Sequence, residues 1–189
     1  MNSLIHLLSK SKYHSFVIAF YVLICGYFFY FIPFPFSYFT INNGDIFLSF
    51  SIFVFAIVTL FIVNNFLYGD NLGINKKNLS QILFIVFYSV ILFALPEEIL
   101  FRGIVQNKIE LMTSNVFIIV IFSALIFGIA HLLNGAKNLH PTNWNWKLVI
   151  ITFTAGLYLS FAYYITGSLV IPVILHSLFI IINKLFVKE

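Results

Sequence analysis

Long uninterrupted apolar stretches constrain the fold of this chain more than any other feature. A transmembrane helix needs about 20 mostly apolar residues, and six stretches of the 189-residue sequence meet that requirement. The stretches are Tyr13–Ile32, Ile46–Tyr68, Gln81–Phe101, Asn115–Leu133, Leu148–Ile165 and Ser168–Val187. Because a backbone in lipid must satisfy its own hydrogen bonds, such stretches form helices. We therefore expect an all-α, polytopic membrane helix bundle with about six transmembrane helices, forming a single integral membrane domain over residues 1–189.

The composition excludes an ordinary soluble domain. Hydrophobic residues make up 61% of the chain and charged residues only 8%, whereas soluble domains carry about 25% charged residues. The formal net charge of +4 would raise the question of nucleic acid in a soluble protein. Here the basic residues lie mainly between apolar stretches, where they set membrane orientation. The sequence thus predicts membrane lipid as the surroundings and no nucleic-acid partner.

The basic residues gather on one side of the expected bundle. With six spans, eight of the ten lysines and arginines lie on the side of both termini, and only Arg102 and Lys108 lie on the other. The positive-inside rule then places both termini in the cytoplasm, in an integral protein of the cell (plasma) membrane. The eight residues are Lys10, Lys12, Lys76, Lys77, Lys137, Lys147, Lys184 and Lys188.

The third stretch ends in a group of ionisable residues, Glu97, Glu98 and Arg102. Ionisable side chains at membrane depth are costly, and by default they indicate a functional site. Glu98 and Arg102 are four residues apart, so they share a helix face and can pair. Glu97 projects about 100° away from Glu98, which leaves its carboxylate free to act as a general base. The alternative is a charged helix end whose side chains reach water.

His131 lies near the end of the fourth stretch. A lone histidine in a span can simply hydrogen-bond a neighbouring helix, but its position here favours a second interpretation. If the third and fourth helices form a hairpin, Glu97 lies 16 residues before Thr113 and His131 lies 18 residues after it. At about 1.5 Å per residue, both lie roughly 25 Å from the turn. We therefore expect them at nearly the same height, provided that the third helix continues to about Met112.

His176 is the remaining ionisable residue at depth. It follows Gly167 by nine residues, or about 13 Å along a helix. With Glu97 and His131 it gives two histidines and one glutamate on three helices, and we expect all three to face one cavity. In the fifth stretch, Gly156 predicts a close approach between helices.

These motifs resemble those of the CAAX proteases and bacteriocin-processing enzymes, the CPBP or Abi family. The family has two adjacent glutamates with an arginine after three further residues, then phenylalanine–three residues–histidine, then a histidine in a later span. In this chain the motif residues are Glu97, Glu98, Arg102, Phe127, His131 and His176. They fall within an Abi/CAAX-protease-like core at about residues 80–187. One position departs from the pattern: Ile180 stands where the family commonly has asparagine.

The resemblance implies an enzyme, an intramembrane endopeptidase that hydrolyses a peptide or a membrane-anchored protein, in peptide maturation or bacteriocin self-immunity. Its catalytic residues would be Glu97, Glu98, Arg102, His131 and His176. In this interpretation Glu97, helped by His131, activates a water molecule, and His176 stabilises the oxyanion. Glu98 and Arg102 hold the site in shape.

Three questions stay open at this level. The first is the cofactor: Glu97, His131 and His176 are the right number and type of ligands for a catalytic zinc, but other family members resemble metal-free glutamate proteases. The second is whether the chain is a non-enzymatic immunity or regulatory protein of the same fold, which Ile180 favours. The third is a small transporter that uses the polar cluster as a proton relay, although no inverted repeat supports it.

Overall fold

The computed structural model describes residues 39–40, 43–68, 77–132 and 144–186, together with the single positions Leu23 and Gly26. Every regular element in this part of the chain is helical, which confirms the all-α prediction. Except for those two positions, the predicted span Tyr13–Ile32 lies outside the described residues. So do five of the lysines that predict the orientation, Lys10, Lys12, Lys76, Lys137 and Lys188.

The helices match the later predicted spans. Helix α3 covers Asn43–Tyr68, α7 covers Val116–Ala130, α8 covers Trp146–Thr166 and α9 covers Val170–Phe186. Between α3 and α7 runs one long helix made of five consecutive segments. These segments are α4 (Leu79–Phe87), η2 (Tyr88–Ala94), α5 (Leu95–Glu98), η3 (Ile99–Gln106) and α6 (Asn107–Met112).

Several of these helices are long and apolar enough to cross a membrane. By length and composition, the described residues contain three such helices, Phe47–Leu67, Leu79–Met112 and Trp146–Thr166, and two shorter apolar helices, Val116–Ala130 and Val170–Leu185. Many large apolar side chains on them face outward, including Phe47, Phe66 and Phe117. An apolar exterior of this kind suits lipid and not water.

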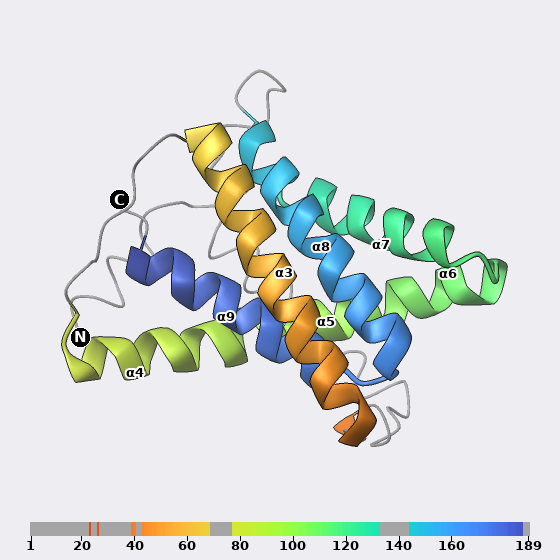
Figure 1. Cartoon of the computed structure of the whole chain (residues 1–189), viewed down its shortest axis with the longest axis horizontal. Coiled ribbons are helices and arrows are strands. Elements are labelled where there is room, and N and C mark those ends of the chain that lie inside the picture. Colours follow the sequence, from red (N-terminus) through yellow and green to blue (C-terminus); the bar gives the residue numbers. More distant parts are fainter. Residues whose placement is uncertain are drawn as a thin grey trace.

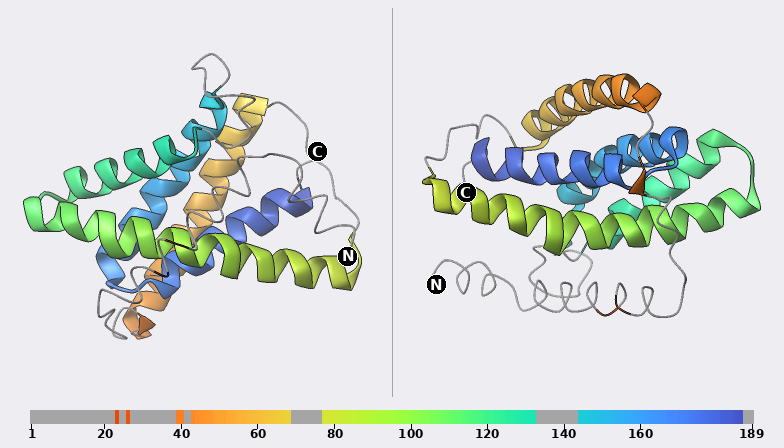
Figure 2. Two further views of the ribbon diagram at one scale, coloured as in Figure 1. Left: turned by 180° about the vertical axis from the view of Figure 1, so that it is seen from behind. Right: turned by 90° about the horizontal axis from the view of Figure 1, so that it is seen from below.

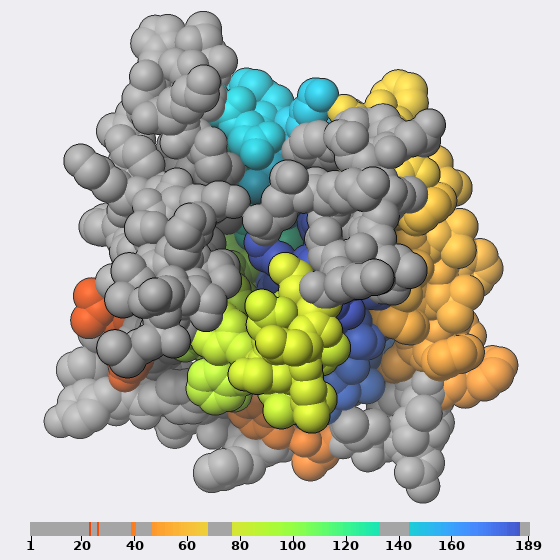
Figure 3. All heavy atoms as spheres, turned by 90° about the vertical axis from the view of Figure 1, so that its left-hand side faces the viewer, coloured from red at the N-terminus to blue at the C-terminus, as the bar shows by residue number. Residues whose placement is uncertain are grey.

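The long helix and α3 lie on opposite sides of the bundle. Figure 1 shows α3 crossing in front of α9 with α8 alongside, and the view from below in Figure 2 shows α9 and α8 between α3 and the long helix. Helix α9 packs against η2, and α7 packs against both α8 and η3. Figure 3 shows the outer end of α4 on one face of the molecule, with α9 and α3 beside it. The centre of the long helix therefore packs against α7, α8 and α9.

Asparagine side chains fix where three helices begin. The Asn78 carboxamide oxygen accepts a hydrogen bond from the backbone amide of Gln81, and the Gln81 side-chain oxygen accepts one from the backbone amide of Asn78. Asn115 caps α7 by accepting from the amides of Phe117 and Ile118, and Asn145 caps α8. Each cap satisfies backbone donors that a helix start leaves free. The Asn115 cap sets the turn of the hairpin, three residues after α6 ends.

Two glycines allow α7 and α8 to approach closely. A Cβ atom at Gly156 would lie 3.1 Å from the Cα of Ala124 and 3.2 Å from the ring of Phe127. A Cβ atom at Gly128 would lie 3.0 Å from the Cβ of Phe153. Small residues at such crossings bring two backbones together in membranes, so the predicted close approach at Gly156 is confirmed.

Candidate active site

The carboxylates of the site lie in the middle of the long helix, between two π-helical segments. Helix α5 carries Glu97 and Glu98, with η2 before it and η3 after it. The amide of Leu95 donates to the carbonyl of Val90 five residues earlier, and Pro96 has no amide proton to donate. Single π-helical turns are frequent at functional sites. The helix nevertheless continues to Met112, as the predicted alignment of Glu97 with His131 requires.

Glu98 and Arg102 form the predicted ion pair. The Arg102 Nε donates to Glu98 Oε2 over 2.8 Å, and both side chains are fully buried. The same guanidinium donates from Nη1 to the hydroxyls of Ser123 on α7, at 2.9 Å, and Ser160 on α8, at 2.7 Å. A buried charge is tolerated when it is paired and hydrogen-bonded. The pair thus ties the long helix to two neighbouring helices.

Both histidines use their Nδ1 atoms to hold the ring in place. His176 Nδ1 lies 2.8 Å from Glu98 Oε1, so Glu98 links α9 to the arginine. His131, just past the end of α7, places Nδ1 2.8 Å from the carbonyl oxygen of Phe127. With Nδ1 occupied in each ring, the Nε2 atoms are the ones that remain for chemistry.

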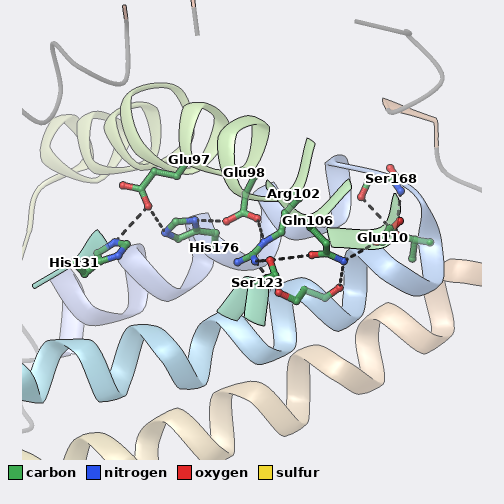
Figure 4. A network of polar contacts seen from close by, with 11 residues as sticks. Glu97, Glu98, Arg102, Gln106, Glu110, Ser123, His131, Ser168 and His176 are labelled. Carbon is green, nitrogen blue, oxygen red and sulfur yellow. Dashed lines mark hydrogen bonds and ion pairs between the residues drawn. The ribbon is translucent and has the colours of Figure 1, made fainter. Parts of the chain in front are cut away.

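The two Nε2 atoms converge on Glu97. Its Oε2 lies 3.4 Å from His131 Nε2 and 3.8 Å from His176 Nε2, and Figure 4 shows Glu97 reaching toward both rings. This oxygen is buried, yet it makes no hydrogen bond with any residue that the structure describes. Three residues predicted from separate helices therefore meet at one point.

The protons on the rings can be assigned from their partners. The Phe127 carbonyl only accepts hydrogen bonds, so His131 must carry its proton on Nδ1. The Glu98 carboxylate is paired with Arg102 and also accepts, so His176 carries a proton on Nδ1 as well. In neutral rings both Nε2 atoms then present lone pairs toward a carboxylate. Three acceptors around one point suit a molecule that brings protons, such as water, or an additional proton on one of the rings.

Glu97, His131 and His176 remain the candidate ligands for a metal ion, and the 3.4 Å between Glu97 Oε2 and His131 Nε2 matches the donor spacing of zinc. Within residues 39–186, across the parts that the structure describes, no group of three or more histidine, cysteine, aspartate or glutamate side chains is arranged to hold a metal ion. Tetrahedral zinc with bonds of about 2.0–2.1 Å would place its donor atoms roughly 3.4 Å apart. The separation between His176 Nε2 and Glu97 Oε2 is longer, at 3.8 Å.

Phe127 packs against Arg102 and against both histidines of the site. Its ring centroid lies 4.6 Å from that of His131 and 5.6 Å from that of His176. The Arg102 guanidinium carbon lies 5.0 Å from the same centroid, within reach of a cation–π attraction. On the remaining side Phe101 makes an edge-to-face contact at 5.0 Å. One buried aromatic ring thus fixes the spacing between the arginine and both histidines.

Gln106, Ser123 and Ser160 belong to the site but were not predicted from the sequence. All three are fully buried. Gln106 lies four residues after Arg102 and eight after Glu98, so a polar residue at helical spacing in an apolar segment was an available signal. The serines gave none, because single serines are common in membrane helices. Their role depends on how α7 and α8 pack.

Position 180 supplies no polar group. Ile180 is half-buried on α9, and Asn183, the next asparagine, is exposed. The orientation of His176 in this chain therefore comes from Glu98 on the long helix.

Together the fold and site define an integral membrane helix bundle with a buried glutamate–histidine centre. The sequence matches the family of type II CAAX prenyl endopeptidases, Rce1-like, over residues 79–182. That region is more than half of the chain and includes every residue of the centre, so the chain belongs to the Rce1-like family.

One curated relative is the uncharacterized protein YpbD of Bacillus subtilis (strain 168). It is 35% identical to this chain over 112 residues, which cover 58% of this chain and 49% of the relative. The chain thus spans about half the length of this relative. No solved structure matches the chain.

Proposed function

We propose that this protein is an intramembrane endopeptidase that cleaves a peptide or a membrane-anchored protein. One observation carries the proposal: Glu97 Oε2 is buried, has no hydrogen bond with any described residue, and faces the Nε2 atoms of His131 and His176. Membership of a prenyl endopeptidase family supplies the reaction class. Chemistry at this point needs no serine or cysteine nucleophile.

In the proposed reaction Glu97, helped by His131, activates a water molecule. The water molecule donates one hydrogen bond to Glu97 Oε2 and one to His131 Nε2, two acceptor atoms that lie 3.4 Å apart. One proton passes to this pair as the water oxygen bonds to the carbonyl carbon of the scissile peptide. The peptide C–N bond then breaks as that proton moves to the leaving nitrogen. Water is consumed, and one carboxyl group and one amine are formed.

His176 is proposed to stabilise the oxyanion of the tetrahedral intermediate. To donate from Nε2 the ring must hold protons on both nitrogens, with Nδ1 donating to Glu98. Two carboxylates, Glu97 and Glu98, then face one guanidinium and one imidazolium, so the buried cluster is neutral as a whole. Neutrality lowers the cost of keeping these charges in a low-dielectric interior. Glu98 and Arg102 contribute by keeping the imidazole in position.

We also propose the cell membrane as the location, with both termini in the cytoplasm, and a role in peptide maturation or bacteriocin self-immunity. Lys147 and Lys184, at the start of α8 and the end of α9, lie on the side that the positive-inside rule assigns to the cytoplasm.

The proposal is tested by purifying the protein, reconstituting it in liposomes and incubating it with a farnesylated CAAX peptide and a mixed peptide library. Mass spectrometry then detects new termini. Wild type should cleave at least one class of peptide, and His131→Ala should lose that cleavage while it still inserts and folds. Equal cleavage by His131→Ala and wild type would remove the proposed role of the histidine, and no cleavage by wild type would argue against a protease.

A second function, a non-enzymatic immunity or regulatory protein of the same fold, is favoured by a single observation, the apolar Ile180 on α9. The two functions separate in cells that lack the gene. An enzyme loses its phenotype with Glu97→Ala, whereas a binding protein keeps it.

A further inference from the structure

We propose that Ser160 and Ser123, together with Gln106, are positioning residues that set the orientation of His176 through Arg102 and Glu98. The proposal rests on the proposed function, because it assigns these residues to the same site. It concerns side chains on α7, α8 and η3 that lie outside the motifs identified in the sequence.

The connection from Ser160 to His176 is a continuous series of short hydrogen bonds. Ser160 Oγ accepts from Arg102 Nη1 at 2.7 Å, Arg102 Nε donates to Glu98 Oε2 at 2.8 Å, and Glu98 Oε1 lies 2.8 Å from His176 Nδ1. Figure 4 shows this series running from Arg102 through Glu98 to the ring of His176. One carboxylate oxygen of Glu98 bonds to Arg102 and the other to His176. A shift of the guanidinium therefore moves the carboxylate and, through it, the imidazole.

The two serines fix the guanidinium from different helices. Arg102 Nη1 donates to Ser123 on α7 and to Ser160 on α8, and both hydroxyls are fully buried. Each serine supplies a fixed acceptor because α7 and α8 pack closely at Gly156. Two acceptors on two helices define the direction of the N–H bonds, whereas one acceptor would leave the planar group free to tilt.

Gln106 orients the Ser123 hydroxyl and holds the backbone of Ser160. Its side-chain nitrogen donates to the backbone oxygen of Ser160 at 3.0 Å, and its side-chain oxygen accepts from Ser123 Oγ at 3.3 Å. Ser123 thus gives its proton to Gln106 and offers its lone pairs to Arg102. A serine with its proton committed in this way is an acceptor toward the cation. Partners of this kind, one layer behind a reactive histidine, fix the ring and its tautomer.

The serines do more than fill space in this arrangement. An alanine at position 160 would preserve the apolar packing of α8 but remove one of the two acceptors of Nη1. We expect His176 to reorient while the bundle stays folded. Because reorientation weakens a contact made to the oxyanion, kcat should fall about tenfold to a hundredfold, with KM little changed.

The experiment compares Ser160→Ala, Ser123→Ala and Ser160→Thr with wild type in liposomes, using whichever peptide of the farnesylated CAAX set or library the wild type cleaves. Ser89→Ala is the matched control, because Ser89 is also fully buried and its hydroxyl donates to the Ile85 carbonyl of its own helix, outside the network around Arg102. Both alanine variants of the network should lower kcat, whereas Ser160→Thr keeps the hydroxyl and should retain most of the rate. Ser89→Ala should match wild type.

A double-variant comparison separates positioning from a structural role. In a Glu98→Gln background, which changes the link to His176, adding Ser160→Ala should cause no further loss of kcat. A loss of the same size in both backgrounds would overturn the proposal, and so would wild-type kcat in Ser160→Ala and Ser123→Ala.

A readout without catalysis distinguishes failure of this inference from failure of the proposed function. In protein labelled with ¹⁵N-histidine, the ring signals of His176 are assigned by their loss in His176→Ala. These signals should shift in Ser160→Ala and stay in place in Ser89→Ala. If they shift although wild type cleaves no peptide, the proposed function fails and the positioning role stands. Unshifted signals in Ser160→Ala would contradict the positioning role whatever the activity.

Discussion

The buried ion pair makes the most quantitative prediction. Arg102→Met replaces the guanidinium by an apolar side chain and leaves Glu98 without its partner at Oε2. Arg102 donates three of the described hydrogen bonds, one to Glu98 and one to each serine, and is fully buried. Removing one partner of such a pair costs about 3–5 kcal/mol, because it leaves an uncompensated buried charge. Total stabilities are about 5–15 kcal/mol, so this loss is large.

The matched variant is Glu98→Gln combined with Arg102→Met. Here no charge is stranded, and replacement of a whole buried pair is often close to neutral. We expect the double variant to recover at least half of the stability that Arg102→Met loses, although not the activity, because His176 loses its carboxylate partner.

The assay unfolds each variant with SDS in mixed micelles of a mild detergent and monitors the loss of helix by circular dichroism. Activity is measured on the same samples. Two results would refute the reasoning. One is Arg102→Met with the stability of wild type, which would mean that the ion pair is exposed to water. The other is a double variant less stable than Arg102→Met, which would mean that charge burial is not the cause of the loss.

Three further predictions concern packing, the helix turn and the cofactor. Gly156→Val should lower the free energy of unfolding by about 1–3 kcal/mol, because a Cβ atom would lie 3.1 Å from the backbone of Ala124; unchanged unfolding in mixed micelles would contradict the close packing. Gly167→Ala should lower the free energy of unfolding by about 1–2 kcal/mol, because this residue ends α8 with φ of 61°. Unchanged unfolding of this variant in the same assay would contradict the left-handed conformation. Active protein treated with a strong chelator should retain its activity and contain no stoichiometric zinc by elemental analysis; activity that falls with the metal and returns with added zinc would instead give Glu97 and the histidines a role as ligands.

The sequence is most informative where the relevant distance lies along one helix or one hairpin. The Glu98–Arg102 pair depends only on four-residue spacing, and the structure contains it. The equal heights of Glu97 and His131 depend only on rise per residue and the position of a turn, and their side chains meet at 3.4 Å. Membrane burial makes these local rules dependable, because lipid forces each apolar stretch to be helical.

Contacts between helices that are far apart in the sequence were not predictable in the same way. The sequence assigned Glu98 to Arg102 alone, but its second oxygen holds His176, 78 residues away. Ser123 and Ser160 contact the arginine only because α7 and α8 present them toward η3. The long helix is also π-helical on both sides of the short segment that holds Pro96, and the apolar pattern of that stretch does not indicate where the hydrogen bonding changes.

The hydrolytic role of Glu97 is tested most directly by Glu97→Gln, which exchanges one oxygen for a nitrogen at nearly constant shape. Liposomes with equal amounts of each protein receive a peptide that wild type cleaves, and the initial rates are compared by mass spectrometry. The account predicts a loss of about a thousandfold or more in kcat, with unfolding in mixed micelles close to that of wild type. A variant that folds and still cleaves within tenfold of the wild-type rate would contradict it.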